Sequence, residues 1–443
     1  MTNPTGPAAT AVTRTLTRTV TIDFAPTVSL FNSFFHANEP VQTANTTCGF
    51  AGLDLNNEVV KAPFIAKGNV CLRGSAPGAQ IIPGTTGSLE IEGILQTWST
   101  AARVAAVQGG TTNITEAQIG GGCRTGGITS GAAHACTSTD RVYATTIGSS
   151  PQHLTRPTFK WADTYTSAAP GPMHPCDASL LGAGEVIGSP PAFDSLTGTP
   201  AAFRFAGAAS GTATDITPAS VDYTCRARDA SGNIGELVWR HTPRRLTVNG
   251  TILFDTDWSP SASPVTTGSV RYLGNGTILC TCPGQVTWGN STEKWCSGDP
   301  YVTSGGATID DCTASSGAYM PFWCPAGIAT CAADPSNVRS RNTLLLVFGG
   351  KNGPLNTNGL NDPIPADVTD IDFKASAAFQ GVLYTVNTCH VHGAGSFFSG
   401  PLICGRINTA GLGDSTFTFP GVNFMSQSAG GGMNFTVSDD QSG

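Results

Sequence analysis

The sequence contains few charged residues. Asp, Glu, Lys and Arg make up 12% of the 443 residues, about half the share found in ordinary soluble domains. The chain has 23 Lys and Arg and a formal net charge of -7. It therefore lacks the basic stripe of nucleic-acid-binding proteins, and we expect no nucleic acid among its partners.

Long apolar runs and helical periods are also missing. Because no run of 18 apolar residues occurs, we expect no membrane span in this chain. The segment Met1–Pro7 has neither the basic nor the apolar region of a signal peptide, so we expect that an export signal or anchor helix is absent or has been removed. No segment shows a long helical period with caps, which favours strands and turns over helices.

Cysteine and glycine, in contrast, are abundant. The chain has 54 glycines and 14 cysteines, and the cysteine number is even. Together with the low charge, this favours an oxidising compartment with several disulfides, and so an extracellular or cell-surface location. Reduced thiols in a cytosolic protein remain the alternative. The cysteines singled out as disulfide candidates are Cys280, Cys282, Cys296, Cys312, Cys324, Cys331, Cys389 and Cys404.

A five-residue sequence motif, called the glycine phrase below, occurs twice. Asn-Gly-Thr-Ile-Leu at 249–253 returns at 275–279. A turn glycine followed by a short β-rich run, repeated at a regular short period, is typical of a β-solenoid. We therefore predict an all-β parallel β-helix in two blocks, with a disulfide-bearing irregular insertion. Looser copies of the phrase lie at 67–72, 86–91, 380–384 and 399–403.

The composition changes along the chain suggest an order of segments. Phe31, Phe34 and Phe35 are expected to cap the first block, and Leu344–Phe348 is expected to be a buried strand. The predicted order is a flexible leader at 1–11, an N-terminal strand, cap and first solenoid block at 12–122, an irregular Cys-containing connection at 123–200, a β-hairpin and second solenoid block at 201–424 with a Cys/Trp-rich loop at about 281–341, and a Gly/Ser tail at 425–443.

Several predicted strand segments also resemble those of a known protein family. Their sequence resembles bacterial cell-surface proteins associated with type IV pilus systems, the PilX-like proteins, over roughly residues 12–424. The resemblance implies a β-solenoid exported part and pilus association, but it carries over no catalytic residue. An N-terminal hydrophobic helix anchors members of that family, and this chain lacks it. The segments are Tyr223–Cys225, Gly235–Trp239, Leu246–Asp255, Gly274–Ile278, Leu344–Val347, Phe379–Tyr384 and Ser399–Leu402.

Two groups of residues have the spacing of metal ligands. His390 and His392 point to one face of a strand, where two imidazoles can share a zinc or copper ion. We favour a disulfide of the adjacent Cys389 with Cys404 over this metal site. Cys280 and Cys282 likewise share a strand face, and disulfides to the later cysteines are favoured over zinc because the paired C-x₂-C spacing is missing.

Paired carboxylates provide the strongest catalytic alternative. Asp255 with Asp257, and Asp370 with Asp372, each lie on one face, and in β-helix enzymes such faces bind calcium or supply an acid and a base. Arg271 is near enough in sequence to assist. We favour the interpretation that these carboxylates form turns.

Three tryptophans in the C-terminal half have two possible roles. Trp288, Trp295 and Trp323 either form a sugar-stacking surface or pack beneath the Cys/Trp-rich loop, and we favour packing.

Together these features predict a non-enzymatic extracellular or cell-surface structural or adhesion protein. It would be pilus-associated, need no cofactor, and present a rigid surface to a protein or carbohydrate surface or to pilus components. The alternative is a polysaccharide-active lyase or hydrolase. That alternative requires Asp255, Asp257 and Arg271 to converge in space.

Overall fold

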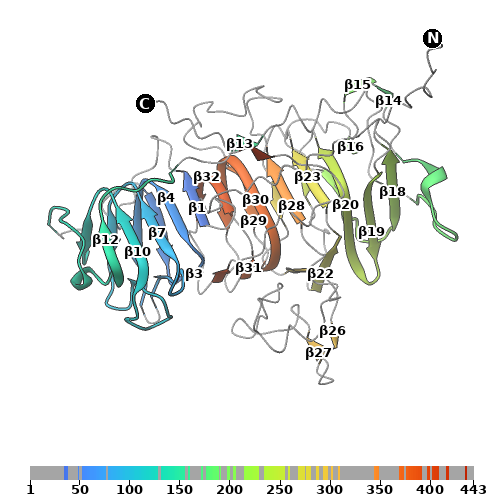
Figure 1. Ribbon diagram of the computed structural model, residues 1–443. Coiled ribbons are helices and arrows are strands. Elements are labelled where there is room, and N and C mark those ends of the chain that lie inside the picture. The colour runs from blue at the N-terminus through green and yellow to red at the C-terminus, as the bar shows by residue number, and fades with distance from the viewer. Residues whose placement is uncertain are drawn as a thin grey trace, which may run out of the picture.

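The computed structural model describes the chain in segments, and the strands among them lie side by side along one long axis (Figure 1). The described residues are 34–37, 48, 52–75, 78–127, 131–154, 158–159, 171–172, 176–188, 190, 197–199, 203–205, 214–228, 234–254, 258–259, 268–274, 276–280, 286–288, 293–297, 301–302, 308–309, 344–348, 369–373, 376–391, 397–399, 402–408, 416–418 and 435–436.

Most of the strands belong to one 22-stranded sheet. Those from the N-terminal part of the chain are β1 (Phe34–Ala37), β3 (Val59–Lys61), β4 (Phe64–Lys67), β6 (Gln80–Ile81), β7 (Ser88–Ile91), β9 (Arg103–Val104), β10 (Ile114–Ile119) and β12 (Ala144–Gly148). Those from the C-terminal part are β16 (Phe203–Phe205), β18 (Tyr223–Arg228), β19 (Ile234–His241), β20 (Arg244–Phe254), β22 (Gly268–Leu273), β23 (Gly276–Cys280), β24 (Val286–Trp288), β25 (Glu293–Ser297), β28 (Leu344–Phe348), β29 (Thr369–Phe373), β30 (Ser376–Val391), β31 (Phe397–Ser399), β32 (Leu402–Asn408) and β33 (Thr416–Thr418).

Among the described residues, the remaining elements form smaller sheets and two short helices. A four-stranded parallel sheet contains β2 (Gly52–Asn56), β5 (Asn69–Arg73), β8 (Leu95–Thr97) and β11 (Cys123–Thr125). The two-stranded sheets pair β13 (Thr158–Phe159) with β34 (Phe435–Thr436), β14 (Gly171–Pro172) with β15 (Thr197–Thr199), β17 (Thr214–Asp215) with β21 (Trp258–Ser259), and β26 (Tyr301–Val302) with β27 (Thr308–Ile309). The 3₁₀ helices are η2 (Ser138–Asp140) and η3 (Ala178–Leu180).

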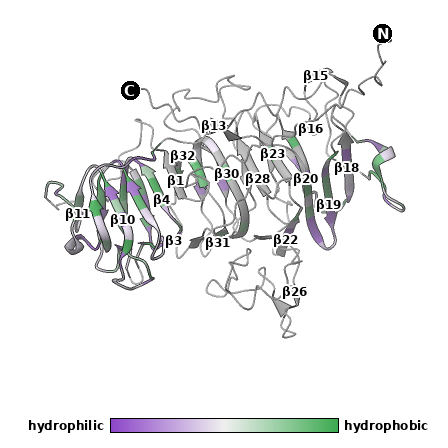
Figure 2. Cartoon of the chain, viewed as in Figure 1, coloured by the Kyte–Doolittle hydropathy of each residue, from purple (hydrophilic) through white to green (hydrophobic). Residues whose placement is uncertain are grey.

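Rows of apolar side chains run across the paired strands and form the core. In the four-stranded sheet, Leu53, Val70, Leu95 and Cys123 are successive register partners, and all four are fully buried. Burying each aliphatic side chain of this kind contributes about 1.5–3 kcal/mol. Figure 2 shows hydrophobic and hydrophilic positions on the same strands near β4 and β10, as expected when alternate side chains face the core.

The duplicated glycine phrase marks two neighbouring strands. The segment Gly250–Phe254 of β20 pairs in parallel with Gly276–Cys280 of β23, in register. Ile252 and Ile278, at equal places in the two copies, are both fully buried. The repetition of the phrase therefore indicates parallel pairing between the two strands that carry it.

The prediction of a parallel β-helix in two blocks is wrong. In the described part of the chain the strands form one 22-stranded sheet and several separate smaller sheets, none of which closes on itself. The N-terminal and C-terminal strands also meet directly, because β1 lies between β32 and β4 and β3 pairs with β33. A regular period indicates that equivalent strands pair in parallel, but it does not determine how many sheets they build or whether a sheet closes.

The aromatic cluster at 31–35 also has another role than the expected cap. Phe34 and Phe35 belong to β1, which pairs on one side with Phe64 and Ile65 of β4 and on the other with Ile403 of β32. This segment therefore joins two groups of strands, and Phe31 lies outside the described residues.

Two local predictions of strands agree with the structure. The β-hairpin expected around the Asp-Ala-Ser-Gly-Asn turn at 229–233 is present as antiparallel β18 and β19. Leu344–Phe348 is strand β28, between β23 and β30. Two segments contain strands that the sequence did not indicate: β24 and β25 of the large sheet lie within the predicted loop at about 281–341, and β34, which pairs with β13, lies within the predicted tail at 425–443.

Candidate functional site

Of the three residues of the catalytic alternative, Arg271 alone lies among the described residues. Asp255 and Asp257 lie outside the described residues. Arg271 lies in β22, where its register partners are Arg245 of β20 and Cys296 of β25. Asp372 lies in β29 and is buried, beside His390 of β30.

The structure places Cys389 and Cys404 in a disulfide between β30 and β32, with Cα atoms 6.0 Å apart. Both cysteines are buried in the core. His390 is half-buried and has Asp372 and Asn408 as its register partners, while His392 lies outside the described residues. The disulfide alternative thus holds for Cys389, and the His390–His392 site stays a prediction.

Among the other disulfide candidates, Cys296 is buried and disulfide-bonded. Cys280 lies in β23, and Cys282, Cys312, Cys324 and Cys331 lie outside the described residues. Three further disulfides join Cys48 to Cys71, Cys123 to Cys136, and Cys176 to Cys225.

One set of side chains has the spacing of a metal centre. Donor atoms of Cys48, Asp54 and Cys71 all lie within 4.8 Å of one another. The two sulfurs are bonded to each other, so neither can act as a thiolate ligand. Arg73 holds the Asp54 carboxylate at 2.7 Å, which accounts for that acid as an ion pair.

The tryptophans separate in the structure. Trp295 is one of the largest fully buried side chains and belongs to the main core, so this residue is buried as the packing interpretation expects, but in β25 of the large sheet rather than beneath a separate loop. Trp288 lies in β24, and Trp323 lies outside the described residues.

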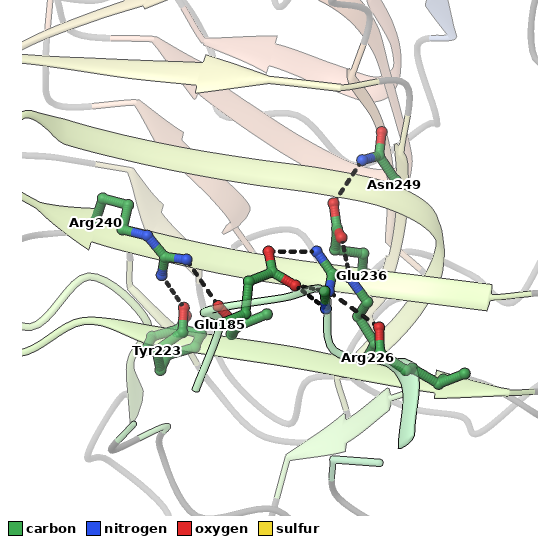
Figure 3. A network of polar contacts seen from close by, with 9 residues as sticks. Glu185, Tyr223, Arg226, Glu236, Arg240 and Asn249 are labelled. Atoms are coloured by element: carbon green, nitrogen blue, oxygen red, sulfur yellow. Dashed lines mark hydrogen bonds and ion pairs between the residues drawn. The ribbon is translucent and has the colours of Figure 1, made fainter. Parts of the chain in front are cut away.

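Figure 3 shows a network of charged and polar side chains on β18, β19 and β20 that sequence reasoning missed. Arg226 of β18 donates hydrogen bonds to the carboxylates of Glu185 and Glu236, and Asn249 of β20 donates to Glu236 at 2.7 Å. Arg226, Glu236 and Asn249 are register partners across three adjacent strands. One guanidinium therefore holds two carboxylates on one face of the sheet.

The charged groups of this network shift each other's pKa values. The Arg226 guanidinium, followed by the Gly182 backbone N–H, lowers the pKa of Glu185 to about 2. Glu185 in turn is the main cause that raises the pKa of Arg226 above its usual range. Both groups stay charged over the whole physiological range, which suits a structural ion pair and gives neither the properties of a general acid or base.

The strand that carries Arg226 is covered by residues 176–187, a segment from earlier in the chain that we call the covering segment. Cys176 is bonded to Cys225, the Asp177 N–H donates to the Arg226 carbonyl at 2.7 Å, and the Thr224 N–H donates to the Ile187 carbonyl at 2.9 Å. An open strand edge is a template for unwanted pairing, so this covering segment protects the end of the sheet. The hairpin register would have paired Arg226 with Glu236 from sequence, but nothing local indicates Glu185.

A second unusual carboxyl lies at the turn between β2 and β3. Glu58 is fully buried and accepts a hydrogen bond from the Asn56 N–H, while its Oε1 has no hydrogen-bond partner. Burial is the main cause that raises its pKa to about 8, and the nearby Asp54 charge adds to the shift. At neutral pH this side chain is therefore mostly a neutral acid.

Comparison with known proteins gives little. No family model matches the chain, and no curated protein matches it. Among solved structures, the competence-associated pilin ComZ from Thermus thermophilus aligns over 88% of this chain and 69% of that chain, with 9% sequence identity and a TM-score of 0.30. This distant similarity is to a pilin and not to PilX-like proteins in particular, and at this TM-score it establishes no common fold or function.

No helix in the segments that the structure describes is both long and apolar enough to cross a bilayer.

Proposed function

We propose that this chain is a non-enzymatic structural protein of the cell surface or extracellular space, associated with type IV pili. It presents the long side of its sheet to a protein or carbohydrate surface or to other pilus components. The observation that carries the proposal is a 22-stranded sheet in which one disulfide joins strands β30 and β32 and another ties a covering segment to β18. A long, cross-linked sheet offers an extended contact surface that keeps its shape.

The positions of the disulfides support the location. Cys176–Cys225 ties a covering segment to β18 at one end of the large sheet, and Cys389–Cys404 joins β30 to β32 within it. Disulfides form and persist in oxidising compartments and are rare in the cytosol. A protein with this many bonded cysteines is therefore suited to the outside of the cell.

The test combines location with thiol state. Intact mass would be measured with and without reduction before alkylation, on protein taken from the extracellular and surface fractions. We expect all 14 cysteines to become alkylatable only after reduction. Mostly free thiols, together with recovery from the cell interior, would contradict the surface location.

Pilus association needs a separate measurement. Sheared pili from the producing strain should carry the protein, and the amount in the sheared fraction should fall when the pilus assembly motor is deleted. Equal amounts with and without pili would remove the pilus from the proposal and leave a surface protein.

The non-enzymatic part is tested with polysaccharides. Incubation with neutral and acidic polysaccharides should release no new reducing ends. Release that disappears in an Asp255→Asn variant would replace the structural function with the enzymatic alternative.

A further inference from the structure

Three arginines form one row across adjacent strands near the end of the large sheet. Arg240 of β19 is the register partner of Arg245 in β20, and Arg245 is the register partner of Arg271 in β22. Neighbouring strands lie about 4.8 Å apart, so the row spaces its arginines at roughly that interval. These strands run side by side in Figure 1.

The row faces away from the core. The residues next to the arginines in sequence, Trp239, Leu246 and Tyr272, are fully buried core residues. Because successive side chains of a strand point to opposite faces, Arg240, Arg245 and Arg271 lie on the outer face. All three are half-buried, so parts of each side chain reach solvent.

Like charges placed directly opposite each other across strands destabilise a sheet. The two carboxylates of the network described above, Glu185 and Glu236, both bind Arg226. Arg240 donates to neutral acceptors, the Tyr223 and Trp239 carbonyls and the Thr224 hydroxyl. Its positive charge is therefore not paired with a carboxylate by these bonds.

We propose that this arginine row binds an acidic polysaccharide. Arginine presents a planar fork of N–H donors that matches the oxygens of sulfate, phosphate and carboxylate groups. Arg245 and Arg271 also interact within the chain. Each guanidinium has five N–H donors, which is enough for internal contacts and an external anion together. An anion seated between adjacent arginines relieves their repulsion.

The surroundings favour a polysaccharide over nucleic acid. The chain carries a net charge of -7, and the carboxylates of Asp222 and Glu185 interact with the charge of Arg240. The positive electrostatic potential around the arginine row therefore extends over only a small part of the surface. Nucleic acids are bound through many phosphates at once and require an extended basic surface. A row of three arginines can bind only a few anionic groups at once, which is sufficient for an acidic polysaccharide. This inference rests on the proposed surface function and names the chemistry of its partner.

The experiment measures binding of the full chain to heparin and polygalacturonate, with dextran as a neutral probe and duplex DNA as a competing polyanion. We expect both acidic polysaccharides to bind, dextran to show no binding, and the affinity to fall between about 50 mM and about 200 mM salt. The double variant Arg245→Gln/Arg271→Gln should bind at least about tenfold more weakly, because charge-assisted hydrogen bonds are lost.

A matched control removes two charges elsewhere. Lys61 ends β3, Lys67 ends β4, and both are exposed. The variant Lys61→Gln/Lys67→Gln changes the net charge equally and should keep its affinity within about twofold. Equal loss in both double variants, no binding of the wild-type chain to either acidic polysaccharide, or duplex DNA binding as tightly through the same arginines would each overturn the proposal.

Folding of the variants is checked by thermal melting and by the mass of the unreduced protein. If the double glutamine variant does not fold, the single variants Arg245→Lys and Arg271→Lys test the proposal instead. They keep the positive charge but lose the forked arrangement of guanidinium N–H donors. Unchanged affinity in both lysine variants overturns the proposal. Surface labelling of intact cells runs in parallel, so a protein that is on the surface but binds no polysaccharide refutes this inference alone.

Discussion

Cys225 in β18 is bonded to Cys176, 49 residues earlier in the chain, with their Cα atoms 4.8 Å apart. The bond fixes the covering segment against the strand at the end of the large sheet. The same strand carries Arg226, whose two carboxylate partners come from the covering segment and from the neighbouring strand. A covalent bond and an ion-pair network thus hold the same segment in place.

Removal of the Cys176–Cys225 disulfide should release this segment. Closing a loop of 49 residues removes chain entropy from the unfolded state, and we expect Cys176→Ser/Cys225→Ser to lower the free energy of unfolding by about 4 kcal/mol. Hydrogen exchange should accelerate first at the Asp177 and Thr224 amides, which bond across this contact.

The control for that variant is Cys123→Ser/Cys136→Ser. This disulfide closes a loop of 13 residues, so the expected loss is about 3 kcal/mol, without faster exchange at Asp177 and Thr224. The same exchange pattern in both variants would show that the covering segment does not depend on its own disulfide.

Glu58 should make the protein less stable as the pH rises. Its pKa is about 8 when folded against an ordinary value of 4.5, so the folded state binds the proton more tightly. The corresponding stability is fully present below pH 4.5 and is lost as the pH rises through about 8. We expect a loss on the order of 5 kcal/mol over this interval, measured as the urea midpoint at a series of pH values.

Glu58→Gln should flatten this pH dependence, because the amide resembles the neutral acid in shape and cannot ionise. Glu92→Gln removes an exposed carboxyl from the same part of the chain and should leave the slope unchanged. A slope that persists in the Glu58→Gln variant would mean that another group titrates.

Glu185 should act in the opposite direction. Its pKa is about 2 when folded, below its ordinary value of 4.5, so its contribution is present above pH 4.5 and is lost as the pH falls through about 2. In Glu185→Gln the acid side of the melting-temperature curve should be shallower than in the wild type. Glu92→Gln serves again as the control, and an unchanged acid limb in Glu185→Gln would contradict the role of the Arg226 pair.

Gly274, which precedes the second copy of the glycine phrase, should tolerate no side chain. It has φ +93°, and a Cβ there would lie 2.2 Å from the Val248 carbonyl oxygen. Gly274→Ala should destabilise the protein by on the order of 3 kcal/mol or more, measured by urea denaturation.

Gly84 is the matched control for this clash. It has φ +88° but no atom within 4 Å of an added Cβ, so Gly84→Ala should cost only the left-handed backbone strain, roughly 1–2 kcal/mol. Equal destabilisation at the two positions would show that the contact with Val248 is relieved by a small movement of the backbone.

The sequence by itself determined the class of the protein and its local strand pairing. Low charge, abundant glycine and the repeated Asn-Gly-Thr-Ile-Leu phrase identified an all-β chain, and the two copies do pair in parallel. The hairpin of β18 and β19 was also predictable, because its turn residues lie between two strand patterns. These features depend on contacts between nearby or equivalent segments, which periodicity reports directly.

Only the tertiary structure decided how the strands are joined and where charges meet. β1 inserts between β32 and β4, so it contacts a strand from the opposite end of the chain, and no local pattern encodes that contact. Glu185 reaches Arg226 from 41 residues away, and Arg240, Arg245 and Arg271 form a row only because the register aligns three strands. Periodicity determines which face of a strand is buried, whereas long-range register determines which residues become neighbours on the opposite face.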